Sequence, residues 1–268
     1  MKTRFGFIGT GNMGGALARA TAKSIAPENI YLADACPEKA AALAAQLGCQ
    51  STTVEEVAQS CQFIFLGVKP QVMSTMLTGI APILKAREQA PVLISMAAGV
   101  RICDLQNMAG GAYPIIRIMP NIPVSVGEGV ILYDATQNVP EEAISAFRSA
   151  LSAAGLVDPL PEALIDAGSA LSGCGPAFVS LFIEALADGA VACGLTRQQA
   201  ISYACQTLIG TARMLQETGM TPGALKDAVC SPGGSTIAGV AALEQGGLRS
   251  AAMQAVDAAF RRTRELGK

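Results

Sequence analysis

Hydrophobic and polar positions in the first half of the chain alternate between short apolar runs and longer amphipathic segments. The apolar runs predict strands near residues 4–9, 30–34, 62–68, 91–96 and 114–119. The segments between them carry the periodicity of helices, near residues 12–24, 37–47, 54–60, 70–85 and 101–108. Strands that alternate with helices are typical of a doubly wound parallel sheet, so this half predicts an α/β fold of the Rossmann type.

The second half follows a different pattern, because it becomes helical throughout. A strand near residues 126–133 and a helix near residues 140–153 come first, and further helices are expected near 177–193, 234–244 and 248–266. Thr196–Gln199 has the sequence of a capping box that opens another helix, and Gly219 ends that helix. We place a domain boundary within Gly155–Pro161, with an α/β domain over residues 1–157 and an all-α domain over residues 158–268.

A glycine-rich loop joins the first strand to the first helix. It reads Gly9-Thr10-Gly11-Asn12-Met13-Gly14, which is the Gly-x-Gly-x-x-Gly spacing of a dinucleotide-binding loop. The first glycine makes the tight turn, the second lets a pyrophosphate approach, and the third lets the helix pack on the strand. Asp34 ends the second strand 20 residues past Gly14, about where an acidic group binds the ribose hydroxyls. The sequence therefore predicts a dinucleotide site that includes Asp34 and the loop around Cys36.

Later strands end in residues that we expect at the same edge of the sheet. Val68-Lys69-Pro70 follows one strand and should border the cofactor, although Lys69 is equally well an ordinary charge at a strand end. Ala97-Ala98 follows the next strand and is small enough for the nicotinamide half to pass. Asn121 follows another, where it either hydrogen-bonds a carboxamide or the substrate, or caps a turn.

The segment Ser231–Gly239 places two adjacent glycines and two hydroxyls within the helical half. Gly233 and Gly234 allow close approach of the backbone to a ligand and positive φ. Ser235 and Thr236 stand where a helical pattern resumes, so free backbone N–H groups are expected there, a suitable site for a carboxylate. A polar turn between helices is the alternative, and the dinucleotide loop at the other end of the chain argues against it.

The composition narrows the class of protein. A net charge of −2 and a pI of about 5.3 provide no basic surface for nucleic acid. Hydrophobic residues make up 51% of the chain and the mean hydropathy is +0.40, but the longest apolar run, over residues 167–183, contains Gly, Ser and Pro, so we expect no membrane span. The surplus apolar surface predicts a large interface between subunits. A first strand that begins within a few residues of the N-terminus leaves no room for a signal peptide, and we expect a cytoplasmic protein.

Eight cysteines and the absence of histidine limit the chemistry. The cysteines form no Cys-x-x-Cys pair and no histidine completes a zinc site, so we expect no metal centre and interpret most of the cysteines as small buried thiols. Without histidine, general acid–base catalysis and Ser–His or Cys–His hydrolysis lack their usual group. The chain therefore suits a reaction in which the substrate brings its own charge.

Several motifs together carry a resemblance to a known family. They are Phe7–Gly14, Val68–Pro70, Ala97–Gly99, Met119–Asn121, Leu171–Phe178 and Ser231–Gly239. In this order they resemble pyrroline-5-carboxylate reductase over essentially the whole chain. The last motif, which continues through Val240, Leu243 and Glu244, is highly specific to that family.

The resemblance implies a dinucleotide-binding domain followed by a helical dimerisation domain. It also implies reduction of Δ1-pyrroline-5-carboxylate to L-proline, the last step of proline biosynthesis, with NADPH or NADH as cofactor. By the same resemblance, Gly233, Gly234, Ser235 and Thr236 hold the substrate carboxylate, Thr236 is the candidate proton donor, and Glu162 contributes near the substrate. Homodimers that assemble further, often to decamers, would be typical of the family.

The choice of cofactor stays open, and two other functions fit less well. Asp34 favours an unmodified ribose, whereas the family commonly prefers NADPH, and only Lys39 is available nearby as a basic partner. A β-hydroxyacid-type dehydrogenase would need a catalytic lysine on the long helix over Ala177–Cys193, which contains none. A non-catalytic nicotinamide-binding sensor would have no need for the anion-binding loop before Thr236.

Overall fold

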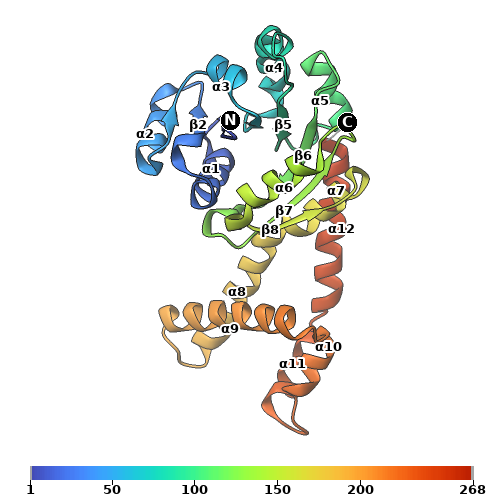
Figure 1. The fold of residues 1–268 in the computed structure, drawn as a ribbon. Helices are drawn as coiled ribbons and strands as arrows, with labels where there is room; N and C mark the ends of the chain where they lie inside the picture. Colours follow the sequence, from blue (N-terminus) through green and yellow to red (C-terminus); the bar gives the residue numbers. More distant parts are fainter. Residues whose placement is uncertain (1, 267–268) are drawn as a thin grey trace. The chain divides into compact units, whose positions relative to one another are not determined.

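The structure is a computed structural model that describes residues 2–266. The chain divides into two compact units (Figure 1). Unit 1 contains the residues up to Gly173 together with the segment from Phe260 onward, and unit 2 is Cys174–Ala259. The predicted boundary between residues 157 and 158 stays a prediction.

Unit 1 is built on one sheet of eight strands in the order β3-β2-β1-β4-β5-β6-β7-β8. The strands are β1 (Phe5–Ile8), β2 (Ile30–Ala33), β3 (Gln50–Ser51), β4 (Phe63–Leu66), β5 (Val92–Ser95), β6 (Ile115–Pro120), β7 (Gly129–Ala135) and β8 (Gly155–Pro159). Neighbouring strands are parallel except β6 and β7, which are antiparallel and pair Ile118 with Tyr133. The chain order reverses between β1 and β4, so the crevice for a ligand is expected outside the carboxyl ends of these two strands.

Helices cover both faces of this sheet (Figure 1). They are α1 (Asn12–Ser24), α2 (Pro37–Leu47), α3 (Val54–Ser60), α4 (Pro70–Lys85), α5 (Ile102–Ala109), α6 (Glu141–Ala150) and α7 (Glu162–Ser172), with 3-10 turns at Pro27–Asn29, Ile122–Val126 and Ser152–Ala154. Buried side chains of α1, α2 and α6 pack with Phe7 on one face, and those of α3, α4 and α5 pack with Ile8 on the other. Phe7 and Phe65 stack across β1 and β4 with ring centroids 4.4 Å apart, which fixes the two central strands together.

Unit 2 is entirely helical over its described length. Its helices are α8 (Gly175–Ala192), α9 (Arg197–Thr218), α10 (Pro222–Ala228), α11 (Ser235–Gln245) and most of α12 (Leu248–Leu266). The predicted capping box is confirmed, because the Thr196 hydroxyl accepts from Gln199 N at 3.3 Å while Gln199 Oε1 accepts from Thr196 N at 3.3 Å. Gly219 ends α9 in the left-handed conformation with φ of +67°, as predicted.

Unit 2 buries little apolar surface of its own. Its buried hydrophobic side chains are Ala187, Ala200, Ala204 and Leu225, and larger ones stay exposed, with Leu181 and Met253 each 67% exposed. By length and composition alone, the helical stretch Glu162–Ala192 is apolar enough to cross a membrane, although the sequence predicted no span. Only 11% of its most apolar window is buried within this chain. The helices of unit 2 therefore present a wide apolar surface to their surroundings.

Several details of the fold differ from expectation. The strands β3 and β8 were not predicted, and β8 extends the sheet by pairing parallel with β7 just where the domain boundary was placed.

The interpretation of most cysteines as buried thiols is wrong, because Cys61 is the one buried cysteine of the eight. Burial raises the pKa of Cys61 to about 11, so this thiol stays protonated. Among the described residues, no group of three or more His, Cys, Asp or Glu side chains could hold a metal ion.

Candidate dinucleotide site and carboxylate loop

The turn from β1 into α1 depends on close contact between backbones. Gly9 has φ of +97°, and a Cβ there would lie 2.5 Å from the carbonyl oxygen of Gly67. A Cβ on Gly14 would overlap the carbonyl oxygen of Gly9, and one on Gly67 would lie 2.6 Å from that same oxygen. Contacts this short are impossible for real side chains, so these three positions need glycine for the protein's own packing.

Gly11 differs from its neighbours because the protein does not need a glycine there. A Cβ at Gly11 would meet no described atom within 4 Å, and its φ of −64° suits any residue. Gly11 is the N-cap of α1, and no described side chain caps that end of the helix. The open space lies in front of the unpaired N–H groups of the first turn, where the helix dipole favours an anion. These residues fit the pyrophosphate of a dinucleotide.

Asp34 lies beside this loop and is tied to it. Its Oδ2 accepts from the backbone N of Thr10 at 2.7 Å and from the Thr10 hydroxyl at 3.0 Å, and its Oδ1 accepts from Cys36 N at 3.0 Å. Burial opposes the charge, but the hydrogen bonds from Cys36 and Thr10 and the charge of Lys39 outweigh it and hold the pKa of Asp34 below its ordinary value. Since a carboxylate can accept about four hydrogen bonds, Asp34 can accept about one more, at Oδ1.

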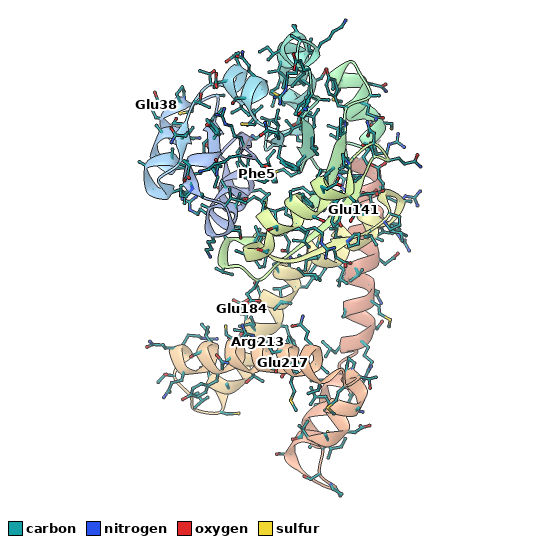
Figure 2. All side chains as sticks on the ribbon, viewed as in Figure 1. Phe5, Glu38, Glu141, Glu184, Arg213 and Glu217 are labelled. Atoms are coloured by element: carbon teal, nitrogen blue, oxygen red, sulfur yellow. The ribbon has the colours of Figure 1, made fainter. Side chains whose placement is uncertain are left out.

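A second carboxylate, that of Glu38, lies in the first turn of α2 (Figure 2). Cys36 is the N-cap of α2, and its thiol donates to Oε2 of Glu38 at 3.1 Å. This hydrogen bond, together with the backbone N–H of Glu38, lowers the pKa of the Glu38 carboxyl. The segment from Asp34 to the first turn of α2 therefore carries two ionised carboxylates, Asp34 and Glu38, and one cation, Lys39.

The residues predicted after β4 and β5 lie at the carboxyl ends of those strands. Lys69 is exposed and is the N-cap of α4, whose first residue is Pro70, and Val68 is half-buried. After β5, Ala97 is 3% exposed, and its backbone N donates to the buried Ser95 hydroxyl at 3.3 Å. Ala98 is exposed.

The side-chain amide of Asn121 makes hydrogen bonds to backbone groups of unit 1. Its Oδ1 accepts from Val130 N at 2.8 Å, and its Nδ2 donates to the carbonyl of Ser172 at 2.9 Å. Its backbone carbonyl accepts from Val124 N at 3.2 Å in the turn that follows β6. The side chain thus links β6 to β7 and to the last residue of α7, and cofactor binding by Asn121 remains a prediction.

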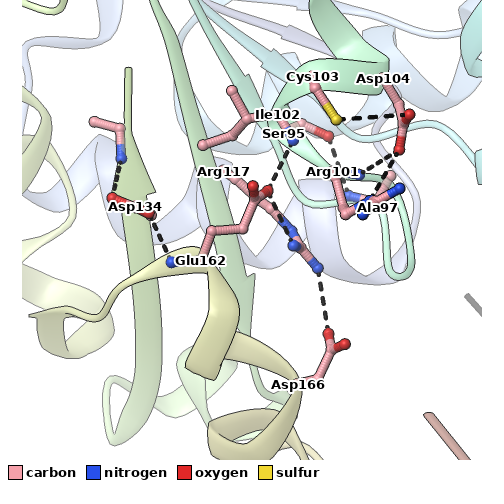
Figure 3. Close-up of polar contacts among 11 residues, drawn as sticks. Ser95, Ala97, Arg101, Ile102, Cys103, Asp104, Arg117, Asp134, Glu162 and Asp166 are labelled. Atoms are coloured by element: carbon pink, nitrogen blue, oxygen red, sulfur yellow. Dashed lines mark hydrogen bonds and ion pairs between the residues drawn. The ribbon is translucent and has the colours of Figure 1, made fainter. Parts of the chain in front are cut away.

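Sequence reasoning missed the buried arginine of β6. Arg117 has a side chain that is 3% exposed, and its Nη1 lies 3.1 Å from Oε1 of Glu162 while its Nη2 lies 3.5 Å from Oδ1 of Asp166 (Figure 3). The same Glu162 oxygen accepts from Ile102 N at 2.7 Å, and Glu162 N donates to Oδ2 of Asp134 at 2.6 Å. The signal was present as a single arginine within the apolar run of β6.

A cavity of about 640 Å³ lies beside this network. It is lined by Gly99 and Ala163 and by the charged side chains of Arg101, Arg117, Arg264, Glu162 and Asp166. Glu162, which was predicted near the substrate, is therefore half-buried at the edge of the cavity and paired with Arg117, and its role stays a prediction.

The predicted carboxylate loop lies in unit 2 and has the expected local geometry. Gly233 has φ of +68°, and Gly234 is the N-cap of α11. A side chain on Gly234 would overlap Oγ of Ser231. Ser235 and Thr236 form the exposed first turn of α11, which contains no acidic residue. The exposed N–H groups and hydroxyls can bind an anion there.

Apart from Glu162 on α7, the predicted residues thus fall into two groups. Those for the cofactor gather at the carboxyl ends of β1, β2, β4, β5 and β6, because these strands are parallel and end at one edge of the sheet. Residues 233–236 form a compact turn in unit 2. Chemically, the first group suits a dinucleotide and the second a small carboxylate.

Two family models match the chain in these same regions. A model described as pyrroline-5-carboxylate reductase dimerisation matches residues 162–266. A model described as NADP oxidoreductase, coenzyme F420-dependent, matches residues 4–99. The first match includes the loop of residues 233–236, and the second includes the glycine loop.

Similar proteins and structures match over the whole length. The chain is 43% identical to a pyrroline-5-carboxylate reductase of Synechocystis over 100% of both chains, and 40% identical to one of Methanosarcina acetivorans over 99% of this chain and 98% of the relative. A solved pyrroline-5-carboxylate reductase from Coxiella burnetii superposes with a TM-score of 0.93 at 32% identity over 100% of both chains. A Plasmodium falciparum pyrroline carboxylate reductase with NADP bound superposes with a TM-score of 0.86 at 32% identity, over 100% of this chain and 99% of the other.

We expect Gly11→Ala to weaken dinucleotide binding by at least tenfold while the protein stays folded. The added methyl meets no protein atom but occupies the space in front of the first turn of α1. The measurement is the Kd of NADH and NADPH by fluorescence titration, with thermal unfolding in parallel.

Gly79→Ala is the matched control, because Gly79 is exposed within α4 and also has open space around its Cβ position. It should keep the wild-type Kd and raise stability by about 0.5–1 kcal/mol. Unchanged binding in Gly11→Ala would show that the pyrophosphate does not approach this glycine.

Proposed function

The chain belongs to the pyrroline-5-carboxylate reductase family, and we propose that it reduces Δ1-pyrroline-5-carboxylate to L-proline, the last step of proline biosynthesis, with a hydride from NADPH or NADH. The observation that carries this proposal is the full-length identity of 43% to a relative of that name. The similarity therefore includes both the dinucleotide edge of unit 1 and the carboxylate loop of unit 2. The direct test is oxidation of NADH and NADPH by the purified protein with this cyclic imine as substrate.

We propose that the residues at the edge of the sheet hold the cofactor. These residues are Gly9, Thr10, Gly11, Asn12, Met13, Gly14, Asp34, Cys36, Val68, Lys69, Pro70, Ala97, Ala98 and Asn121. When bound, the reduced nicotinamide supplies the hydride. The glycine loop fixes the pyrophosphate, and the small side chains of Ala97 and Ala98 leave room for the nicotinamide half.

The loop before α11 binds the substrate carboxylate in this proposal. Ser235 and Thr236 begin α11, so their N–H groups have no acceptor within the helix, whereas Gly234 N donates to the carbonyl of Ser231 at 3.1 Å. The positive end of the helix dipole lies at this first turn. Gly233 adopts the left-handed conformation that turns the chain into this position. Holding the carboxylate fixes the ring, so that its imine carbon can receive the hydride in one orientation.

Thr236 is the proposed proton donor. The hydride attacks the ring carbon of the C=N bond, the π electrons move to nitrogen, and nitrogen takes one proton, which gives the secondary amine of proline. If nitrogen is already protonated, the iminium accepts the hydride without an acid. For the neutral imine, a hydroxyl or a water that Thr236 holds is sufficient, and this suits a chain with no histidine.

We also propose a homo-oligomer in which a second copy of the chain covers the apolar surface of α8 and α9. Leu181 on α8 and Tyr203 on α9 are 67% and 56% exposed, which is unusual for residues of this kind unless a partner covers them. The same proposal includes further assembly of the dimers, up to decamers. It also describes a soluble cytoplasmic enzyme that binds neither membranes nor nucleic acid.

Thr236→Ala should lower turnover on the imine by roughly 10- to 100-fold near neutral pH, at the weak end of general acid catalysis because water can replace the hydroxyl. The Kd of the dinucleotide should stay nearly unchanged. Residual activity should be largest at low pH, where the substrate nitrogen carries its own proton. Turnover is measured across a pH series, with Thr78→Ala, an exposed threonine of α4, as control. Wild-type turnover at every pH would exclude Thr236 as donor.

Asp34→Ser and Asp34→Asn should shift the preference between the cofactors toward NADPH, because they remove a charge that faces the 2′-phosphate. Repulsion in a partly shielded site corresponds to about 1–3 kcal/mol, or roughly 5- to 150-fold in the ratio of specificity constants. The wild type should use NADH at least comparably with NADPH. Both substitutions also weaken the hydrogen bond from Thr10, which affects the binding of both cofactors equally. The ratio of the specificity constants for NADPH and NADH therefore reports only the effect of the lost charge.

Asp158→Asn, at an exposed position on β8, is the control for these substitutions and should leave the ratio unchanged. A wild type that strongly prefers NADPH, combined with no shift in the Asp34 variants, would mean that Asp34 does not face the ribose. Lys39 and the backbone around Cys36 would then have to set the preference.

The protein should sediment as a dimer or larger assembly at micromolar concentration, and Leu181→Asp should dissociate it. An aspartate at this position would place an unpaired charge in the interface, at a cost of several kcal/mol. Leu156→Asp, at a position that is 58% exposed on β8, is the control and should leave the assembly intact. An active wild-type monomer in sedimentation velocity would refute the proposal.

A further inference from the structure

A charged network in unit 1 holds one of the loops at the edge of the sheet. We propose that Glu162 is a positioning residue, whose carboxylate fixes the loop of residues 96–101 in the conformation that receives the nicotinamide half of the dinucleotide. This inference rests on the proposed function, because it requires the dinucleotide to lie across the carboxyl ends of the strands. It gives Glu162 a task that is separate from contact with the substrate.

The loop between β5 and α5 is tethered at both ends. At its start, Ala97 N donates to the hydroxyl of Ser95 at 3.3 Å. At its end, the first residue of α5, Ile102, donates its backbone N–H to Oε1 of Glu162 at 2.7 Å (Figure 3). Between the two tethers, Ala98 and Gly99 are exposed, and Gly99 has φ of +76°. Within the loop, Val100 N also donates to the carbonyl of Ala97 at 3.4 Å. Hydrogen bonds at the two ends and this one across the loop therefore hold its exposed middle in one shape.

Glu162 is itself fixed by charges from the sheet. Its carboxylate lies 3.1 Å from Nη1 of Arg117, whose guanidinium is almost completely buried in the middle of β6. The backbone N of Glu162 donates to Asp134 on β7 at 2.6 Å. A buried arginine needs a carboxylate partner, so Glu162 cannot turn away without leaving that charge poorly compensated. Asp166 also pairs with Arg117, at 3.5 Å, but has no described contact to the loop.

We call the hydrogen bonds of the Glu162 carboxylate to Ile102 N and Arg117 the clamp. The strand order limits the effect of this clamp to one half of the ligand. The pyrophosphate loop follows β1 and the ribose-binding Asp34 follows β2, whereas β5 lies beyond β4 on the opposite side of β1. In a doubly wound sheet, the dinucleotide extends across the point where the strand order reverses. With the adenosine half over β2, the nicotinamide half lies over β4 and β5. Loss of the clamp should therefore weaken contacts to nicotinamide and leave contacts to ADP-ribose intact.

The test compares Glu162→Gln with Asp166→Asn. Each variant replaces one of the two carboxylates that pair with Arg117 by a neutral amide. Of the two residues, Glu162 alone also contacts Ile102 N. The probes are the nicotinamide dinucleotide that the wild type binds more tightly and the matching ADP-ribose or 2′-phospho-ADP-ribose, both titrated by calorimetry without imine. Glu141→Gln, an exposed glutamate on α6, is the control for the change of residue type (Figure 2).

In Glu162→Gln we expect the Kd of the dinucleotide to rise about tenfold, because a neutral amide oxygen is a weaker acceptor than a carboxylate, both for Ile102 N and for the Arg117 guanidinium. The Kd of the ADP-ribose probe should stay within twofold of the wild type, which also shows that the variant is folded. Asp166→Asn and Glu141→Gln should change both constants by less than twofold. In imine reduction, the KM for the imine should not rise in Glu162→Gln beyond the change in dinucleotide binding.

Three results would overturn the inference. An equal loss of both probes in Glu162→Gln would show a general structural role, and an equal loss in Glu162→Gln and Asp166→Asn would show that only the charge on Arg117 matters. A rise in the KM for the imine with unchanged dinucleotide binding would make Glu162 a substrate contact. These binding measurements do not use the imine, so a wild type that fails to reduce it would refute the proposed function and leave the clamp to be judged by the two probes.

Discussion

The contact of backbone against backbone at Gly9, Gly14 and Gly67 is the constraint on which the rest of unit 1 depends. No side chain fits between β1, β4 and the start of α1. The two strands and the helix therefore approach more closely than any pair of larger residues would allow. This approach points the first turn of α1 at the edge of the sheet and leaves open space in front of Gly11. Packing thus requires glycine at positions 9, 14 and 67, whereas at Gly11 the absence of a side chain leaves space for a ligand.

A buried charge organises the other side of the same sheet. Arg117 lies in a strand whose residues are all buried, and its charge is compensated by two carboxylates of α7. Since one of these carboxylates also accepts from the first residue of α5, the arginine links β6 to α7 and, through Glu162, to α5. The Nε of Arg117 has no partner among the described residues, so the two terminal nitrogens make all of its described hydrogen bonds. Apolar packing alone would not fix these elements to particular atoms.

The sequence predicted the parts of the fold that local chemistry decides. Short apolar runs identified β1, β2, β4, β5, β6 and β7, and cap residues such as Thr196 and Gly219 identified the ends of α9. The short strand β8 was missed because Asp158 and Pro159 interrupt its apolar pattern and its pairing with β7 is decided by distant residues. The antiparallel direction of β7 was missed for the same reason, because strand direction depends on how the chain returns and not on composition.

The candidate site was predicted to a similar extent. The glycine loop and the turn at Gly233 were recognisable because positive φ and close approach restrict which residues can stand there. The partners of Asp34, Asn121 and Glu162 were not, because each reaches a backbone group far away along the chain. Arg117 could have been suspected from its apolar neighbours, but its ion pairs with α7 depend on tertiary structure. Side chains that act over long sequence distances were thus the unpredictable part of the site.

The scarcity of buried side chains in unit 2 affects how this protein is made. Ala187, Ala200 and Ala204 provide little apolar area, so α8 and α9 gain most of their stabilisation only when another surface covers them. If that surface is a second copy, the final folding step is bimolecular and its rate falls as the chain becomes dilute. A newly synthesised chain would then complete the sheet of unit 1 early. Its helices α8 and α9 would keep their apolar side chains exposed until the chain binds a second copy. Chaperones that bind exposed apolar helices would compete with assembly during that interval.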